Sequence, residues 1–135
     1  LGMSMVEGCT VVGGQQGITV HSSSTDIMGN RVSRTTGQAI AVVEMSMGMA
    51  SHNAIRGALG VGLYCGDRSM CMFDHNTVIG TRADTASGLR NRRGVAVLAD
   101  FQSEASLWRN RLVGNPVAMG TTTNAILRRT SRPGW

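Results

Sequence analysis

A short phrase of apolar and polar positions recurs along the chain. In each copy an apolar residue stands three positions before an Asn, and another apolar residue stands two positions after it. The copies are centred on Asn30, Asn53, Asn76 and Asn110, at intervals of 23, 23 and 34 residues. A period of this size is typical of a solenoid, in which successive coils place equivalent residues one above another. The pattern therefore predicts a stack of similar coils.

A second pattern precedes each Asn phrase. It is a short apolar run that begins at or near a Gly, and it covers residues 17–20, 38–42, 60–65 and 94–97. Alternating apolar residues in such short runs predict β-strands. With a strand on either side of the Asn as well, each coil is expected to hold three strands. The apolar residues that flank the Asn are expected to point inward, namely Ile27, Ala50, Phe73, Leu107, Val32, Ile55, Val78 and Leu112.

These two phrases resemble the repeat of right-handed parallel β-helix proteins, the pattern of the pectate-lyase-like superfamily and of NosD-like repeats. The resemblance covers about residues 5–126 and implies an all-β, right-handed parallel β-helix with about 5–6 coils of roughly 23 residues. We divide the chain into a β-helix segment, residues 1–127, with an inserted loop at 81–93, and a non-repetitive C-terminal tail, residues 128–135. Lyases, epimerases, phage tailspikes and structural surface proteins share this repeat, so the resemblance implies a fold and no single activity.

The Asn of each phrase is expected at a bend between two strands, in the left-handed backbone region that Asn tolerates. Stacked coils would place the four Asn side chains about 4.8 Å apart in a ladder of amide hydrogen bonds. Cys9 stands where the first coil would have its Asn, and we expect it to be a small buried residue. Neither end shows an amphipathic helix that would cap the stack. We therefore expect a segment of a longer protein whose ends meet other protein segments or subunits.

The chain has three Cys residues. Cys65 and Cys71 are six positions apart around Gly66 and Asp67, and this spacing allows a small disulfide loop at a corner of a coil. The alternative is two separate reduced thiols. A disulfide favours an oxidising compartment, so we expect an extracytoplasmic protein that is secreted, periplasmic or on the cell surface.

The inserted loop of residues 81–93 is the candidate binding loop. Its charged members are Arg82, Asp84, Arg90, Arg92 and Arg93, in a chain whose net charge is +5 and which contains no Lys. Insertions in solenoids often gather on the binding face. Guanidinium groups suit carboxylates, sulfates and phosphates, which indicates an anionic glycan or an acidic protein surface as partner. The alternative is a solvated loop without a partner. No basic run with interleaved aromatic residues indicates nucleic-acid binding.

Methionine is unusually frequent, with nine residues. When the coils are aligned on Asn53 and Asn76, Met47 matches Met70, Met49 matches Met72, and His52 matches His75. Thioether and imidazole ligands together suit copper, which would fit a NosD-like periplasmic module. Met47, Met70, His52 and His75 are therefore weak candidate metal ligands. The alternative is that the Met side chains fill gaps in the coils and that the His pair is solvated. No other cofactor is expected.

The acidic residues bear on catalysis. Polysaccharide lyases and hydrolases need carboxylates clustered with basic groups on one outer face. The alignment on the Asn residues gives no column with two carboxylates, and Asp100 and Glu104 with Arg68 form the one candidate cluster. The chain also lacks an apolar stretch long enough to span a membrane.

The function expected from the sequence is therefore a non-catalytic structural or binding β-helix segment of an extracytoplasmic protein or assembly, in contact with a polysaccharide or a protein. Two alternatives stay open. One is a carbohydrate-active enzyme similar to polysaccharide lyases or epimerases, and the other is the copper-associated NosD-like module.

Overall fold

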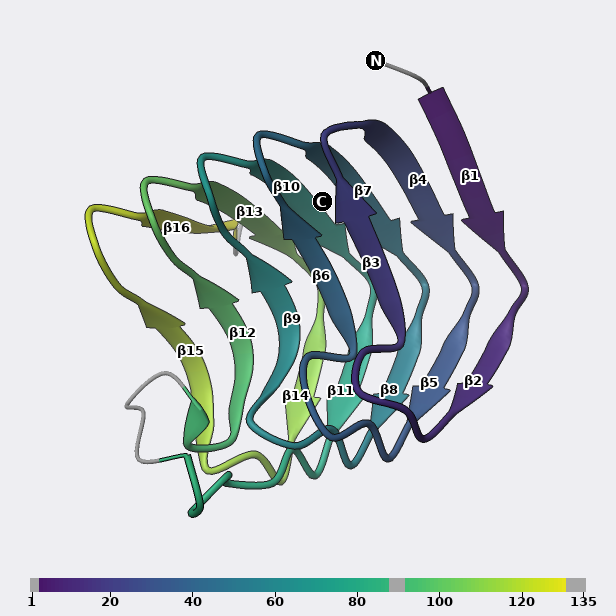
Figure 1. Ribbon diagram of the computed structural model, residues 1–135, viewed down its shortest axis with the longest axis vertical. Helices are drawn as coiled ribbons and strands as arrows, with labels where there is room; N and C mark the ends of the chain where they lie inside the picture. The colour runs from purple at the N-terminus through teal and green to yellow at the C-terminus, as the bar shows by residue number, and fades with distance from the viewer. Residues whose placement is uncertain (1–2, 88–91, 131–135) are drawn as a thin grey trace.

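The computed structural model describes residues 3–87 and 92–130, which form a parallel β-solenoid of about five coils (Figure 1). Its strands are β1 (Met3–Glu7), β2 (Thr10–Val12), β3 (Ile18–His21), β4 (Ser24–Met28), β5 (Arg31–Ser33), β6 (Ile40–Val43), β7 (Met47–Ser51), β8 (Ala54–Arg56), β9 (Val61–Cys65), β10 (Met70–Asp74), β11 (Thr77–Ile79), β12 (Val95–Ala99), β13 (Glu104–Trp108), β14 (Arg111–Val113), β15 (Val117–Thr121) and β16 (Ile126–Thr130).

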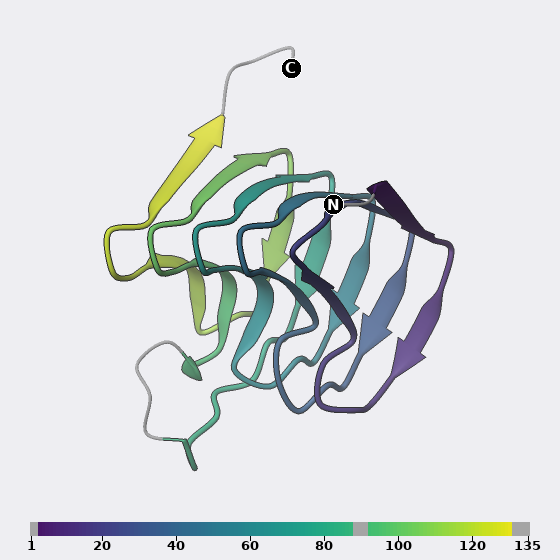
Figure 2. The ribbon, with the colours of Figure 1, turned by 45° about the horizontal axis from the view of Figure 1, so that its top comes forward.

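Each coil gives one strand to each of three parallel sheets. Sheet A has the order β1-β4-β7-β10-β13-β16, sheet B the order β14-β11-β8-β5-β2, and sheet C the order β15-β12-β9-β6-β3. The coils lie side by side from the N-terminal to the C-terminal end of the stack, as both views of the ribbon show (Figures 1 and 2). The predicted all-β parallel solenoid and its period of about 23 residues are confirmed. Within the described residues no helix has the length and apolarity needed to cross a lipid bilayer.

The hydrophobic core runs along the axis of the stack. Alternate residues of each strand point inward, and the inward residues of neighbouring coils are in register. On sheet A this row is Ile27, Ala50, Phe73 and Leu107, all buried. On sheet B it is Val32, Ile55 and Val78, which are buried, followed by the half-buried Leu112. The pattern of apolar positions around each Asn thus predicted the core correctly.

The bend between sheets A and B differs from the expectation in one respect. The left-handed residue is the one before each Asn, with φ of 65° at Gly29, 56° at His52, 53° at His75 and 55° at Arg109. The Asn residues themselves do not have positive φ. The prediction of left-handed Asn was therefore wrong, because the Asn side chain must point inward to reach the backbone of the preceding coil. The residue before each Asn therefore adopts the left-handed conformation that reverses the chain.

The corner between sheets C and A is built from two consecutive left-handed residues. These pairs are Glu44–Met45, Asp67–Arg68, Phe101–Gln102 and Thr123–Asn124. Each pair connects a sheet C strand with the next sheet A strand. Non-glycine residues rarely adopt this conformation, and its recurrence in four coils makes it a property of the repeat.

Two segment boundaries differ from the expected ones. Strand β16 pairs with β13 through Thr130, so residues 128–130 belong to the solenoid, and residues 131–135 lie outside the described residues. The insertion leaves the stack later than residue 81, because Arg82 still bridges Leu59 of the preceding coil. An antiparallel bridge between Ala83 and Arg93 closes its base.

Candidate functional site

The four Asn residues form one hydrogen-bonded column, which we call the Asn column. The amide nitrogen of Asn53 donates to Oδ1 of Asn76 at 2.9 Å, and the amide nitrogen of Asn76 donates to Oδ1 of Asn110 at 3.0 Å. Each side chain also donates to the backbone of the preceding coil, as Asn76 does to the carbonyl of Ala50 at 2.9 Å. Asn30, Asn53 and Asn76 are buried. The column therefore satisfies the polar groups of the A–B bend and has a structural role.

Cys9 extends this column without being buried. Its backbone N–H donates to Oδ1 of Asn30 at 2.8 Å, and its side chain is exposed and free of a disulfide. The expectation of a small buried residue was wrong. The first described coil has a neighbouring coil on only one side, so its bend is less covered than those inside the stack.

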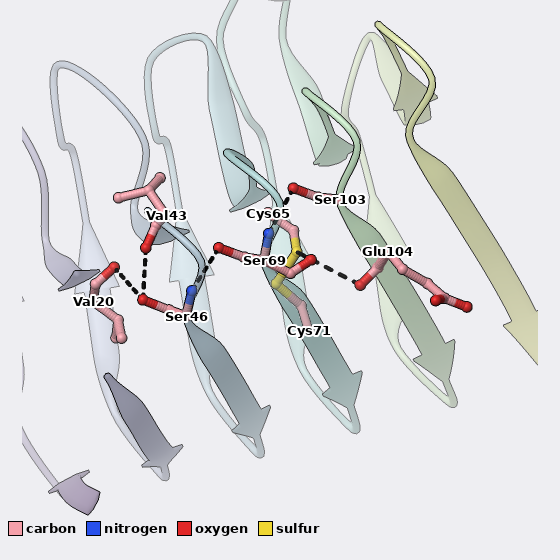
Figure 3. Close-up of a disulfide and its surroundings, with 8 residues drawn as sticks. All are labelled: Val20, Val43, Ser46, Cys65, Ser69, Cys71, Ser103 and Glu104. Atoms are coloured by element: carbon pink, nitrogen blue, oxygen red, sulfur yellow. Dashed lines mark hydrogen bonds between the residues drawn. A yellow bond between two sulfur atoms is a disulfide. The ribbon is translucent and has the colours of Figure 1, made fainter. Parts of the chain in front are cut away.

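A second polar column was missed by the sequence argument. Ser23, Ser46, Ser69 and Ser103 each stand seven residues before a member of the Asn column. The backbone N–H of Ser46 donates to Oγ of Ser69 at 3.1 Å, and that of Ser69 donates to Oγ of Ser103 at 3.1 Å (Figure 3). This Ser column closes the C–A corner as the Asn column closes the A–B bend. The constant offset from Asn was the signal that would have found it.

The Cys65–Cys71 disulfide is present, and Figure 3 shows it beside the Ser column. Both Cys residues are buried. It joins the end of β9 to β10, across the corner formed by Asp67 and Arg68. The two Cα atoms are 6.2 Å apart. The bond therefore ties sheet C to sheet A at one corner of the third coil.

The inserted loop uses two of its Arg side chains internally. Nε of Arg92 donates to Oδ2 of Asp84 at 2.9 Å, and its Nη2 donates to the carbonyl of Thr36 at 3.1 Å. Nε of Arg82 donates to the carbonyl of Gly57 at 3.0 Å. These contacts fasten the base of the loop to the preceding coils. Arg93 is exposed and Arg90 lies outside the described residues.

The outer face of sheet A carries an unusual set of side chains. The methionine face, as we call it, consists of Met3, Met5, Met28, Met47, Met49, Met70 and Met72. These side chains are between 38% and 90% exposed. On β7 and β10 the inward residues are buried, so the exposure of the Met side chains there follows from strand alternation. The expectation that the Met residues fill gaps in the coils is therefore wrong for these seven.

Four members of this face form a compact group. Met47 is directly opposite Met70, and Met49 is directly opposite Met72, on the adjacent strands β7 and β10. We call these four residues the methionine quartet. Asp26 is the register partner of Met49 on one side, and Glu104 is the register partner of Met70 on the other. The quartet is thus a rectangle of thioethers with a carboxylate at two opposite corners.

The His pair does not join this group. The rings of His52 and His75 stack at 4.8 Å with an interplanar angle of 2°, and Trp108 meets His75 edge-on at 5.3 Å. Nδ1 of His75 lies 2.9 Å from Oδ2 of Asp74. Both His residues follow the C-terminal ends of β7 and β10, whereas Met47 and Met70 begin these strands. The predicted set of Met47, Met70, His52 and His75 is therefore divided between opposite ends of the strands, and Met49 and Met72 are the nearer neighbours.

An open groove of about 610 Å³ follows the C–A corner. Its lining includes Glu44, Asp67, Arg68, Phe101 and Gln102. Glu44 and Asp67 are 23 residues apart, and the N–H of Met45 donates to the carbonyl of Asp67 at 2.8 Å. Two carboxylates therefore occupy equivalent positions in adjacent coils. The expectation that no column holds two carboxylates was wrong. Glu44 and Asp67 each stand nine residues before a member of the Asn column, so the alignment on the Asn residues already places them together.

The expected cluster of Asp100, Glu104 and Arg68 is not assembled. Asp100 is buried and accepts hydrogen bonds from the Tyr64 hydroxyl at 3.1 Å and from the Thr122 hydroxyl. Burial raises the pKa of the Tyr64 phenol far above its usual value, and the Asp100 carboxylate raises it further. Glu104 accepts from Nε of Arg128, and Arg68 donates to Gln102. These residues have separate, structural partners.

Among residues 3–87 and 92–130, no three His, Cys, Asp or Glu side chains gather as a metal-binding group. Comparison of the chain with protein-family models, curated proteins and solved structures finds no match. The surfaces described above are therefore the basis for assigning a function.

Proposed function

We propose that this chain is a rigid, non-catalytic binding segment of an extracytoplasmic protein or assembly, with the methionine face as its binding surface. The exposure of seven Met side chains on one outer sheet face carries this proposal. Ser24 and Asp26 of β4 separate Met3 and Met5 from the methionine quartet, in which four exposed Met residues are contiguous. Contiguous exposed apolar side chains mark interaction sites on soluble proteins. Met is unbranched and flexible, and surfaces rich in it adapt to the shape of a partner.

A protein partner suits this face better than a polysaccharide. Sugar hydroxyl groups need strong hydrogen-bond donors and acceptors, and a thioether is only a weak acceptor. An apolar protein surface needs neither. Arg93, which is exposed at the base of the inserted loop, provides a second contact for acidic groups of that partner.

Two further observations support the remaining parts of the proposal. The carboxylates of Asp84, Asp100 and Glu104 all have internal partners, which favours structural roles over catalysis. The buried Cys65–Cys71 disulfide supports an extracytoplasmic location, because such bonds persist in oxidising compartments.

Methionine oxidation tests the proposal whatever the identity of the partner. The native extracytoplasmic fraction and the purified chain are first treated with a copper(I) chelator, so that a bound metal ion cannot protect the thioethers. Both are then exposed to dilute peroxide. Sulfoxide formation is then followed at each Met by mass spectrometry. We expect the methionine quartet to react more slowly in the native fraction. Met45, which is 69% exposed at the C–A corner and outside the methionine face, should react equally in both. Equal rates for the quartet in the two samples would refute a partner on this face.

A second candidate function is a carbohydrate-active enzyme, favoured by the groove at the C–A corner. Glu44 and Asp67 lie in adjacent coils, beside Arg68, and such a set of acidic and basic groups is what glycoside cleavage requires. Purified protein and the Glu44→Gln, Asp67→Asn double variant are incubated with acidic and neutral polysaccharides. Chain cleavage by the parent that the double variant lacks would establish this function, and cleavage by neither would exclude it for those polymers.

A further inference from the structure

The methionine quartet has the composition and placement of a metal site. We propose that Met47, Met49, Met70 and Met72 bind one soft, monovalent metal ion of the copper(I) class. The inference goes beyond the proposed function, since it concerns the same exposed face but does not depend on a protein partner there.

The register brings the four thioethers within reach of one ion. Paired strands are about 4.8 Å apart, and outward residues two positions apart on one strand are separated by roughly 6.6 Å. Met47 and Met70 form one short edge of this rectangle, and Met49 and Met72 form the other. A Met side chain has three rotatable bonds beyond its Cα atom, and each of these side chains is about half exposed. The sulfur atoms can therefore lean toward the centre without any movement of the backbone.

The chemistry of the donors selects the ion. Thioether sulfur is soft and uncharged, so it favours copper(I) over zinc, calcium or magnesium. The quartet has no thiolate or imidazole of its own, and those groups would widen the choice of metal. Asp26 and Glu104 flank the quartet in register on opposite sides. The negative charge of Asp26 favours a bound cation, whereas the charge of Glu104 is balanced by its ion pair with Arg128. The hard oxygen atoms of both carboxylates are poor ligands for copper(I).

Neighbouring ligands do not share this site. His52 and His75 lie beyond the far ends of β7 and β10, stacked on each other, and Nδ1 of His75 faces Asp74. Met49 is the quartet member nearest to His52, three positions before it, which corresponds to about 10 Å along a strand. His52 and His75 also have positive φ, so they lie on the bend and not on the sheet face. Cys9 is an exposed thiol and will bind copper(I) independently. It must therefore be removed before the quartet can be measured.

Three chains in a Cys9→Ser background test the proposal. The first has no further change. The second carries Met47→Leu, Met49→Leu, Met70→Leu and Met72→Leu, which remove the sulfur atoms and keep the apolar volume. The third is a matched control with Met3→Leu, Met5→Leu, Met28→Leu and Met45→Leu, four exposed Met residues outside the quartet. Copper(I) is titrated without oxygen against a chromogenic chelator, and silver(I) serves as a probe that does not change oxidation state.

We expect the first and third chains to bind one equivalent with the same affinity. The second should bind at least about 100-fold more weakly, because all of the donor atoms are gone. Methyl NMR of the nine Met residues adds an independent measurement. Silver(I) should shift the four quartet signals in the first chain and leave the other methyl signals in place.

Equal weakening in the second and third chains would overturn the proposal, because it would indicate non-specific binding to exposed thioethers. Undiminished binding in the second chain would overturn it as well. These failures are separate from a failure of the proposed function. Absence of binding to the purified chain, together with oxidation protection in the chelated native fraction, leaves the protein partner and removes the metal. Metal binding by the purified chain without oxidation protection in the chelated native fraction leaves the metal site and removes the protein partner.

Discussion

The two faces of sheet A are built from alternate residues of the same strands and obey different constraints. On β10, Cys71 and Phe73 point inward and are buried, whereas Met70 and Met72 point outward and are more than half exposed. On β7, Gly48 and Ala50 are inside, and Met47 and Met49 are outside. Packing explains the inner set, since neighbouring coils must fill one narrow core. It does not explain the outer set, where polar residues would be as stable and more soluble. The outer face is therefore where a function is to be sought.

Polar groups reinforce this contrast. Inside, most members of the Asn and Ser columns are buried, and hydrogen bonds connect them from coil to coil. Outside, apolar thioethers are left uncovered. Buried polar groups without partners are costly, which is why the interior columns are so regular. The exterior has no such requirement, and its regularity comes from the repeat alone.

The largest expected effect is on the inner face. Phe73→Ala should lower the free energy of unfolding by about 3–5 kcal/mol, because it leaves a cavity in the narrow core. Met72→Ala, on the neighbouring residue of the same strand, should change it by about 0.5 kcal/mol or less, as for other surface positions. Urea unfolding followed by circular dichroism measures both. Similar losses for the two variants would contradict the distinction between the faces.

The second-largest effect on the free energy of unfolding is expected from removal of the disulfide. Cys65→Ala with Cys71→Ala should lower the free energy of unfolding by about 2 kcal/mol, the entropic value for a loop of this short length. The purified parent chain, analysed without reductant, should have a mass two hydrogens lower than the reduced chain, and only Cys9 should react with an alkylating reagent. Alkylation of all three thiols in native material would contradict the bond and weaken the proposed location.

The Asn column should contribute a similar amount. Asn76→Ala removes an amide that bonds Asn110 and Ala50 and accepts from Asn53. The expected loss is about 1–3 kcal/mol, since buried partners are left unsatisfied. Ser106→Ala, an outward position on sheet A, is the control and should be close to neutral. Equal stability of Asn76→Ala and the parent chain would contradict a structural ladder.

The sequence predicted the solenoid, its period, the inner rows of apolar residues and the Asn column, because all of these repeat at a fixed interval. Features that occur only once in the chain were harder to predict from the sequence. The departure point of the inserted loop depends on Arg82 and Arg92, which bond carbonyl groups far away in sequence. No local sequence pattern predicts such contacts.

The candidate site was predicted only in part. The pairing of Met47 with Met70 and of Met49 with Met72 was correct, and it follows from the repeat. Their exposure was not predicted, although it follows from the expectation that Ala50 and Phe73 point inward, because alternate residues of a strand face opposite sides of the sheet. The position of the His pair depends on where β7 and β10 end. A difference of one residue at a strand end decides whether a side chain lies on the sheet or on the bend.

A Tyr on sheet C, Tyr64, extends the comparison to that sheet. We expect it to make the free energy of unfolding depend on pH in the alkaline range. It is the only Tyr of the chain, and burial and the Asp100 carboxylate raise its pKa in the folded state. In the unfolded state its pKa is about 10. Because the folded state retains the proton more strongly, this contribution to stability is complete below about pH 10 and is lost as the pH rises above that value. Ultraviolet absorbance should detect tyrosinate near pH 10 in denaturant and only at higher pH in the native chain. Identical titrations would contradict the burial of this phenol.

The smallest effect is expected where the proposed function is located. Replacing the whole methionine quartet with Leu keeps the apolar volume and changes only the sulfur atoms, and the side chains are about half exposed. The free energy of unfolding should therefore stay within about 0.5 kcal/mol of the parent value for each substitution, and the slope of the urea transition should not change. A variant that folds normally, yet loses the soft metal or the protein partner, separates the role of the outer face from that of the core. A loss of several kcal/mol would instead mean that the thioethers stabilise the sheet, and the exposure of the methionine face would then have a structural cause.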